Sequence, residues 1–308
     1  MAAAAPALIG IVGPTAAGKS DAAVTLALAV GGEIVSCDSL QVYRGLDLGS
    51  AKPTPAERLS VAHHLLDVAD PSQPFSAATW VGLAQAAIAG IVQRRRLPIV
   101  VGGTGLYLRA LLQGLFEGPS RDEALRRRLE GIAQRHGRER LHRLLRGIDP
   151  EAAARIAAAD LVRVIRAIEV YRATRRPLSS HFDATRPGLP GYRVVLFGLS
   201  PSRERLRERV EARTAAMLKG GLAEEVRALL NAGLSPEARP LQAIGYRQAL
   251  AVVRGGMDVA AARRAIVTET MQYAKRQRTW FRHQAEVTWF EDGARLCAAA
   301  QAWLREAE

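Results

Sequence analysis

The chain has 308 residues, of which 48% are hydrophobic, and a mean hydropathy of -0.02, as expected for a globular protein with a sizeable core. No apolar run is long enough to cross a bilayer, and the first residues lack the basic start and apolar stretch of a signal peptide. The two cysteines, Cys37 and Cys297, form no metal-ligand cluster, and we expect no disulfide. These features exclude a membrane protein and a disulfide-rich secreted domain, and they predict a cytoplasmic protein with a loose tail over residues 1–6.

The net charge of +13 and a pI of about 10.7 predict a polyanionic partner, most simply a nucleic acid. The alternative is arginine enrichment from a GC-rich genome, which the many alanines also fit. Arginine dominates so strongly that the only lysines are Lys19, Lys52, Lys219 and Lys275. Because the planar guanidinium does not reproduce the compact charge of an ammonium group, these lysines are candidates for specific roles.

The first third of the chain alternates between predicted strands and predicted helices. Strands are expected over residues 8–12, 33–37, 64–68 and 97–101, and helices over residues 21–30, 77–94 and 106–112. This order is typical of a parallel sheet, whose site lies at the carboxyl ends of the strands.

Residues 121–176 differ, because they show helical periodicity and carry 15 basic against 8 acidic residues. A connector is expected over residues 186–191, followed by a strand over 192–199, helices over 202–280 and a last strand over 286–290. We predict an α/β fold, with a P-loop NTPase-like parallel sheet core, helices on both faces and a mostly helical insertion. The predicted parts are residues 1–120, 121–190 and 191–308.

The strongest local motif is a P-loop between the first predicted strand and the first predicted helix. In it, two glycines separated by four residues are followed by lysine and serine. Its backbone N–H groups and the helix N-terminus would surround a di- or triphosphate, Lys19 would reach a phosphate, and Ser20 would hold Mg²⁺. The motif is typical of nucleotide-binding and ATP-binding proteins, yet it indicates phosphate without specifying ATP. It comprises Gly13, Pro14, Thr15, Ala16, Ala17, Gly18, Lys19 and Ser20.

Two polar residues follow predicted strands beside the P-loop. Asp38 could bind Mg²⁺ or take a proton from a nucleophile, or it could be an ordinary turn or helix-capping residue. Thr104 lies among glycines that allow close approach of a ligand, although a helix N-cap is the alternative. The sequence does not decide between these alternatives.

Later in the chain, Lys275, Arg278 and Arg282 share one face of a predicted helix that also carries Trp280 and Phe281. This pattern suits a phosphate backbone with stacked bases, and it equally suits a solvated face with core aromatics. The paired histidines His63 and His64 do not indicate a metal site.

Several motifs together resemble the tRNA dimethylallyltransferases, in family order and over nearly the whole chain. These motifs are residues 13–20, 38–47, 51–54, 63–67, 102–107, 166–171, 242–247 and 275–280. The resemblance implies transfer of a dimethylallyl group from dimethylallyl diphosphate to N6 of adenosine 37, in tRNAs that read codons beginning with U. The P-loop would then hold the diphosphate of the prenyl donor.

By the same resemblance, Asp38 would be the base for the adenine amine, Thr104 would hydrogen-bond at the reacting centre, and Lys19, Ser20 with Mg²⁺ and Arg213 would neutralise the diphosphate. It also implies tRNA contacts, including the anticodon stem-loop and a flipped adenine. The implied tRNA contacts are Asp38, Ser39, Leu40, Gln41, Thr104, Arg126, Val162, Arg163, Val164, Ile165, Arg166, Gln242, Ala243, Ile244, Gly245, Tyr246, Arg247, Lys275, Arg276, Gln277, Arg278, Thr279, Trp280, Phe281 and Arg282.

Three other functions remain open at this point: a P-loop kinase, an adenylate prenyltransferase acting on free AMP, and an RNA-binding protein with a vestigial P-loop. The kinase leaves the basic insertion unexplained, and the intact Lys19, Ser20 and Asp38 disfavour the third. The chain lacks the Cys/His pairs of the zinc finger found in eukaryotic relatives, so we expect the compact bacterial form, without zinc and monomeric.

Overall fold

The computed structural model describes residues 5–114, 116, 118–119, 121–181 and 188–306. Its internal contacts divide the chain into two compact units. The core unit comprises Met1–Leu112 and Leu189–Glu308, and the helical unit comprises Gln113–Gly188. Residues 1–4 of the predicted tail and residues 186 and 187 of the predicted connector lie outside the described residues.

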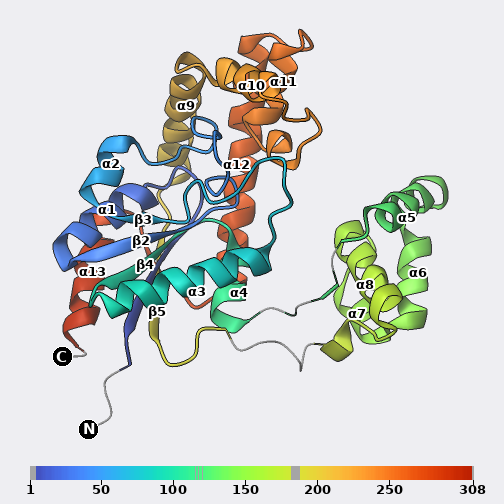
Figure 1. Ribbon diagram of the computed structural model, residues 1–308, viewed down its shortest axis with the longest axis horizontal. Helices are drawn as coiled ribbons and strands as arrows, with labels where there is room; N and C mark the ends of the chain where they lie inside the picture. Colours follow the sequence, from blue (N-terminus) through green and yellow to red (C-terminus); the bar gives the residue numbers. More distant parts are fainter. Residues whose placement is uncertain (1–4, 115, 117, 120, 182–187, 307–308) are drawn as a thin grey trace. The chain divides into compact units, whose positions relative to one another are not determined.

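The core unit is built on a six-stranded parallel sheet in the order β3-β2-β4-β1-β5-β6 (Figure 1). In β1, successive side chains alternate between two apolar cores, as the pleat of a strand requires. The strands are β1 Ala7–Val12, β2 Gly32–Cys37, β3 His63–His64, β4 Leu97–Gly102, β5 Arg193–Leu199 and β6 Thr288–Phe290.

Helices cover both faces of this sheet, which confirms the predicted α/β class. Ile9 and Ile11 of β1 share a core with α1 (Lys19–Val30) and α13 (Gly293–Arg305). Leu8 and Val12 point to the opposite face, where they share a core with α3 (Ala77–Gln93) and α4 (Gly105–Gln113). The other helices of this unit are α2 Pro55–Ser60, α9 Arg203–Lys219, α10 Leu222–Asn231, η2 Arg239–Gln242, α11 Tyr246–Val253 and α12 Val259–Gln284.

One predicted strand, residues 64–68, is wrong beyond its first residue. Only His64 lies in β3, and the backbone then turns through positive φ values at Leu65 (65°) and Asp67 (58°). Asp67 accepts hydrogen bonds from the Lys52 ammonium at 2.5 Å and from Arg58 at 2.9 Å. The apolar pattern of residues 64–68 favoured a strand. The structure has a turn there instead, and Asp67 in that turn is hydrogen-bonded to two cationic side chains.

The helical unit contains α5 (Glu123–His136), α6 (Arg138–Ile148), α7 (Pro150–Arg155), α8 (Leu161–Thr174) and the short η1 (Ser179–His181). Its apolar core draws mainly on leucine, isoleucine and alanine side chains of these helices. The predicted mostly helical insertion is therefore confirmed. None of the helices in the described residues of either unit combines the length and the apolar character that crossing a bilayer requires.

Candidate active site

The P-loop leaves β1 in a backbone conformation that depends on glycine. A Cβ atom on Gly13, whose φ is +137°, would lie 2.4 Å from the Leu199 carbonyl oxygen. Gly18 adopts the left-handed conformation at the N-cap of α1 and provides no side-chain cap there. The first N–H groups of α1 therefore remain available to an anion, as the motif predicts.

Three side chains from the C-terminal half of the chain brace this loop. Arg209 donates from Nη1 to the Ala17 carbonyl oxygen at 2.7 Å, and Arg213 donates from Nη1 to Thr15 Oγ1 at 3.1 Å. Gln277 accepts the backbone N–H of Thr15 on Oε1 at 2.8 Å. Helices α9 and α12 therefore hold the P-loop from outside its own strand-loop-helix unit.

Asp38 follows β2 and closes a tight turn. Its Oδ1 accepts the backbone N–H groups of Leu40 at 2.8 Å and Gln41 at 3.3 Å. The turn alternative considered for Asp38 is thus realised, but it occupies only Oδ1, and no hydrogen bond reaches Oδ2 from the described part of the chain. The second oxygen leaves this carboxylate able to accept a proton.

Thr104 lies immediately before α4 and holds the Asp38 turn from the neighbouring strand. Its Oγ1 accepts the backbone N–H of Ser39 at 3.1 Å, and its carbonyl oxygen accepts from Tyr107 and Leu108 at the start of α4. The hydroxyl keeps its own proton to donate elsewhere. Thr104 is therefore both a helix-start residue and a constituent of the Asp38 environment.

Cationic groups surround this carboxylate. The pKa of Lys19 is lowered to about 8, mainly because the group is buried; the Asp38 charge opposes this lowering and the Arg213 charge adds to it. Burial likewise lowers the pKa of Arg213, again opposed by Asp38. The Lys19 Nζ donates to the Pro14 carbonyl oxygen at 2.7 Å. Burial of cations next to one carboxylate makes the site favourable for a second, anionic ligand.

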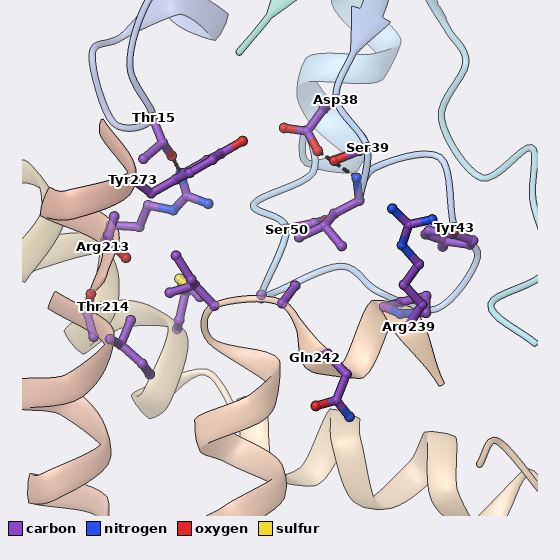
Figure 2. A pocket seen from close by; sticks show the side chains of 18 of the residues that line it. Thr15, Asp38, Ser39, Tyr43, Ser50, Arg213, Thr214, Arg239, Gln242 and Tyr273 are labelled. Carbon is purple, nitrogen blue, oxygen red and sulfur yellow. Dashed lines mark hydrogen bonds between the residues drawn. The ribbon is translucent and has the colours of Figure 1, made fainter. Parts of the chain in front are cut away.

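Two pockets meet at these residues. Figure 2 shows side chains that line one of them, with Asp38, Arg213 and Tyr273 among those labelled. The first, of about 390 Å³, contains the P-loop and Gln277, and we call it the polar pocket. The second, of about 460 Å³, is lined by aromatic and aliphatic side chains together with several polar ones, and we call it the apolar pocket. The side chains common to both pockets are Thr15, Asp38, Ser50, Arg213 and Tyr273. Asp38 and Arg213 therefore stand where a ligand in one pocket would meet a ligand in the other.

The loop of residues 38–54, which lines both pockets, is held by charged side chains. The Lys52 Nζ donates to the Tyr43 carbonyl oxygen at 2.6 Å and to Asp47 at 2.7 Å. Glu225 of α10 accepts the N–H of Leu48 at 2.8 Å and the hydroxyl of Tyr246 at 2.6 Å. Lys52 thus has the specific role that its rarity suggested, and this role is structural.

The predicted tRNA residues of the core unit divide between the pockets and the interior. Those in the 38–41 and 242–247 segments that line a pocket are Asp38, Ser39, Leu40, Gln41, Gln242, Ala243 and Ile244. Tyr246 is fully buried, and Arg247 is ion-paired with Glu269. Because the Tyr246 ring packs over Gly49 and its hydroxyl is taken by Glu225, a direct tRNA contact does not fit this side chain.

The predicted tRNA residues on α12 also divide into exposed and buried side chains. Lys275, Arg276 and Arg282 are exposed, as a nucleic-acid-binding face requires. Phe281 is buried, so the core alternative applies to it, and Trp280 is half-buried with its ring against Gly105. Gln277 is also buried, and it lines the polar pocket. The remaining members of the predicted segment are the half-buried Arg278 and the exposed Thr279.

In the helical unit, the structure places Arg126, a predicted tRNA contact, in the interior. Arg126 is 7% exposed and forms a two-pronged ion pair with Glu169, with both N–O distances at 2.9 Å. Val164 and Ile165 are also buried in the core of this unit. A tRNA contact therefore does not fit these three side chains, whereas Val162 and Arg163 are exposed and Arg166 is half-buried.

Sequence reasoning missed several residues of the site. Arg209 lies one helical turn before Arg213, a spacing that places both side chains on one face of α9, and this spacing could have identified it. Tyr273 lies one turn before Gln277 and lines both pockets. Arg239 lines the apolar pocket from η2, and no local motif marks it.

Known protein families match most of the chain. An IPP transferase model matches residues 41–284, and an isopentenyl transferase model matches residues 6–70. A tRNA dimethylallyltransferase from Solibacter usitatus is 47% identical over 285 residues, which is 92% of each chain. One from an Anaeromyxobacter species is 49% identical over 286 residues, covering 92% of this chain and 93% of that protein.

Solved structures agree with this result. The tRNA isopentenylpyrophosphate transferase of Bacillus halodurans is similar with a TM-score of 0.71 and 38% identity, covering 98% of this chain and 96% of that one. A eukaryotic dimethylallyltransferase acting on tRNA gives a TM-score of 0.78 at 25% identity, covering 98% of this chain and 80% of that one. Since a family model spans most of its length and relatives are nearly half identical across it, the chain belongs to the IPP transferase family.

Proposed function

We propose that this protein transfers a dimethylallyl group from dimethylallyl diphosphate to N6 of adenosine 37 in tRNAs that read codons beginning with U. The observation that carries the proposal is the meeting of a polar phosphate-type pocket and an apolar pocket at Asp38 and Arg213. A group transfer between two substrates needs such a junction, with a base and an anion-stabilising cation on either side of the reacting atoms.

The diphosphate occupies the polar pocket. Its charge is met by the open N-terminus of α1, by Lys19 and by Arg213, all of which lie in or at the edge of that pocket. As the bond between C1 and the bridging oxygen breaks, its electron pair stays on the diphosphate, and these groups stabilise the growing negative charge. Arg213 is well placed for this role, because it also contacts Thr15 of the P-loop.

Magnesium fits the same pocket through Ser20. The described residues contain no group of three His, Cys, Asp or Glu side chains that could hold a metal by themselves. The Ser20 hydroxyl, at the exposed start of α1, would therefore be the protein ligand, with phosphate oxygens and water completing the shell that Mg²⁺ prefers. When bound, the ion would add charge stabilisation for the departing diphosphate.

Asp38 takes the proton. The N6 lone pair forms the new bond to C1, and the amine proton moves to the Asp38 oxygen that the turn leaves free. The adenine reaches this point through the apolar pocket, whose aromatic side chains suit a flipped base; these are Tyr43, Phe75, Tyr107 and Tyr273. The products are N6-isopentenyladenosine and diphosphate.

Exposed basic side chains hold the tRNA. The exposed Lys275, Arg276 and Arg282 of the core unit and Arg163 of the helical unit are available to its anticodon stem-loop. We propose that the protein acts as a monomer, and the tRNA substrate supports a cytoplasmic location.

The test is transfer of labelled dimethylallyl from its diphosphate, with Mg²⁺, to an unmodified tRNA bearing A36 and A37. An A37→G transcript and free AMP serve as controls. Label on the A37 tRNA alone supports the proposal. Label on AMP would assign the protein to cytokinin synthesis, and phosphoryl transfer from ATP without any prenyl transfer would assign it to the kinases.

A further inference from the structure

The buried side chain of Gln277 connects the P-loop to the loop that follows β4. Its Oε1 accepts the backbone N–H of Thr15 in the P-loop at 2.8 Å. Its Nε2 donates to the carbonyl oxygen of Gly103, after β4, at 2.9 Å. The side chain is 7% exposed, so water cannot easily replace either bond.

The two bonded partners belong to opposite sides of the reaction centre. Thr15 also accepts a hydrogen bond from Arg213, on the diphosphate side. Gly103 precedes Thr104, whose hydroxyl holds the turn that carries Asp38, on the base side. A single amide therefore connects the loop for the leaving group to the loop for the proton acceptor.

The contact is close enough to restrict both residues. A Cβ atom added to Gly103 would lie 2.2 Å from Gln277 Nε2, so any larger residue there would displace the amide. The two bonds also make opposite demands, an acceptor toward Thr15 and a donor toward Gly103. Only a carboxamide or a protonated carboxyl group of this length meets both demands at once.

We propose that Gln277 is a positioning residue that sets the spacing between the P-loop and the Asp38 turn, and so the approach of the adenine amine to the prenyl carbon. The inference rests on the proposed function and goes beyond it. Because small displacements of reacting groups reduce rates strongly, the effect should appear in kcat more than in the KM for tRNA.

The informative variants are Gln277→Met and Gln277→Glu. Methionine keeps the length and apolar packing but removes both hydrogen bonds, and we expect kcat to fall by about 10- to 100-fold, with the KM for tRNA within about twofold of wild type. Glutamate restores both bonds only while it is protonated. We therefore expect the ratio of Gln277→Glu to wild-type kcat to rise as the pH falls from 8.5 to 6.0.

Division by the wild-type profile removes the titration of the other groups that line the polar pocket, which the variant and wild type share. These groups are Lys19, Asp21, Asp38, His63, Arg209, Arg213 and Tyr273. Gln272→Glu, at an exposed position on the same helix, is the matched control and should follow wild type at every pH. Thermal unfolding of each variant identifies any simple loss of fold.

The outcomes separate the two proposals. If the wild type transfers no prenyl group to tRNA, the proposed function fails, and the Kd for inorganic diphosphate with Mg²⁺ still tests Gln277, which we expect Gln277→Met to raise by about three- to tenfold. An unchanged Kd in that case would overturn the role of Gln277. If the wild type is active, a Gln277→Met kcat within twofold of wild type would overturn it, as would a Gln277→Glu ratio that does not change with pH.

Discussion

Each unit contains a group of partly or fully buried charged side chains. The two groups differ in whether their cations are paired with a carboxylate. In the helical unit, Glu169 accepts hydrogen bonds from Arg126 at 2.9 Å, from Arg166 at 2.6 Å and from the Asp122 backbone at 2.8 Å. In the core unit, Lys19 and Arg213 contact P-loop oxygens, and neither forms an ion pair with a carboxylate within the described residues.

The first arrangement neutralises its charges internally, whereas the second retains positive charge for a ligand. A buried pair that is fully hydrogen-bonded contributes to a defined packing, and removing one partner leaves an uncompensated charge. Partly buried cations without a carboxylate partner are costly, which their lowered pKa values reflect, and an anionic ligand relieves that cost. The same residue type is thus structural in one unit and part of the candidate site in the other.

The largest effect is expected for Asp38→Asn. Asparagine can still accept the Leu40 and Gln41 N–H groups on Oδ1, so the turn is kept while the proton acceptor is lost. We expect prenyl transfer to fall by about 10²- to 10⁴-fold, with tRNA affinity within about twofold. Single-turnover transfer and filter binding measure the two quantities, and substantial remaining activity would contradict the base assignment.

Arg213→Ala tests the cation that is kept for a ligand. Loss of the guanidinium should lower kcat/KM for dimethylallyl diphosphate by about 10²- to 10³-fold, as for loss of one donor to a developing anion. Arg207→Ala on the same helix is the matched control, because Arg207 is exposed and pairs with Glu211. If steady-state kinetics showed the same fall in kcat/KM for both substitutions, Arg213 would have no specific role in stabilising the diphosphate.

Glu169→Gln tests the neutralised cluster. The substitution leaves Arg126 buried without its carboxylate, and we expect the helical unit to lose about 3–5 kcal/mol of stability. Native-state hydrogen exchange of amides in α5 and α8 measures this loss. Glu151→Gln, which breaks the exposed pair with Arg155, is the control and should cost at most about 0.5 kcal/mol.

Acid should weaken the same cluster. Hydrogen bonds from Arg126 and Arg166 outweigh burial and lower the pKa of Glu169 from 4.5 to about 2. Because the unfolded chain binds this proton more readily, the stabilisation is complete above pH 4.5 and is lost as the pH falls toward 2, by roughly 1–3 kcal/mol. Hydrogen exchange at several pH values should show the stabilities of wild type and Glu169→Gln converging in acid. If the two stabilities instead changed in parallel with pH, protonation of Glu169 would not be the cause of the acid sensitivity.

Local patterns in the sequence predicted the P-loop, the strands at residues 8–12 and 97–101, and the placement of Asp38 and Thr104 at strand ends. Each depends on a few neighbouring residues, because strand alternation, glycine conformation and helix starts are local properties. The resemblance to the tRNA dimethylallyltransferases added the substrates and Arg213, whose own surroundings in the sequence are uninformative. The predicted roles of these residues remain predictions.

Partners far apart in the chain decided what local patterns could not. The resemblance implies a tRNA contact for both Arg126 and Gln277. The fold pairs Arg126 with Glu169 of α8 and places the Gln277 side chain between Thr15 and Gly103. The physical reason is that the burial and hydrogen bonding of a polar side chain depend on which surface covers it. That surface is formed only when segments more than 40, or more than 250, residues apart pack together.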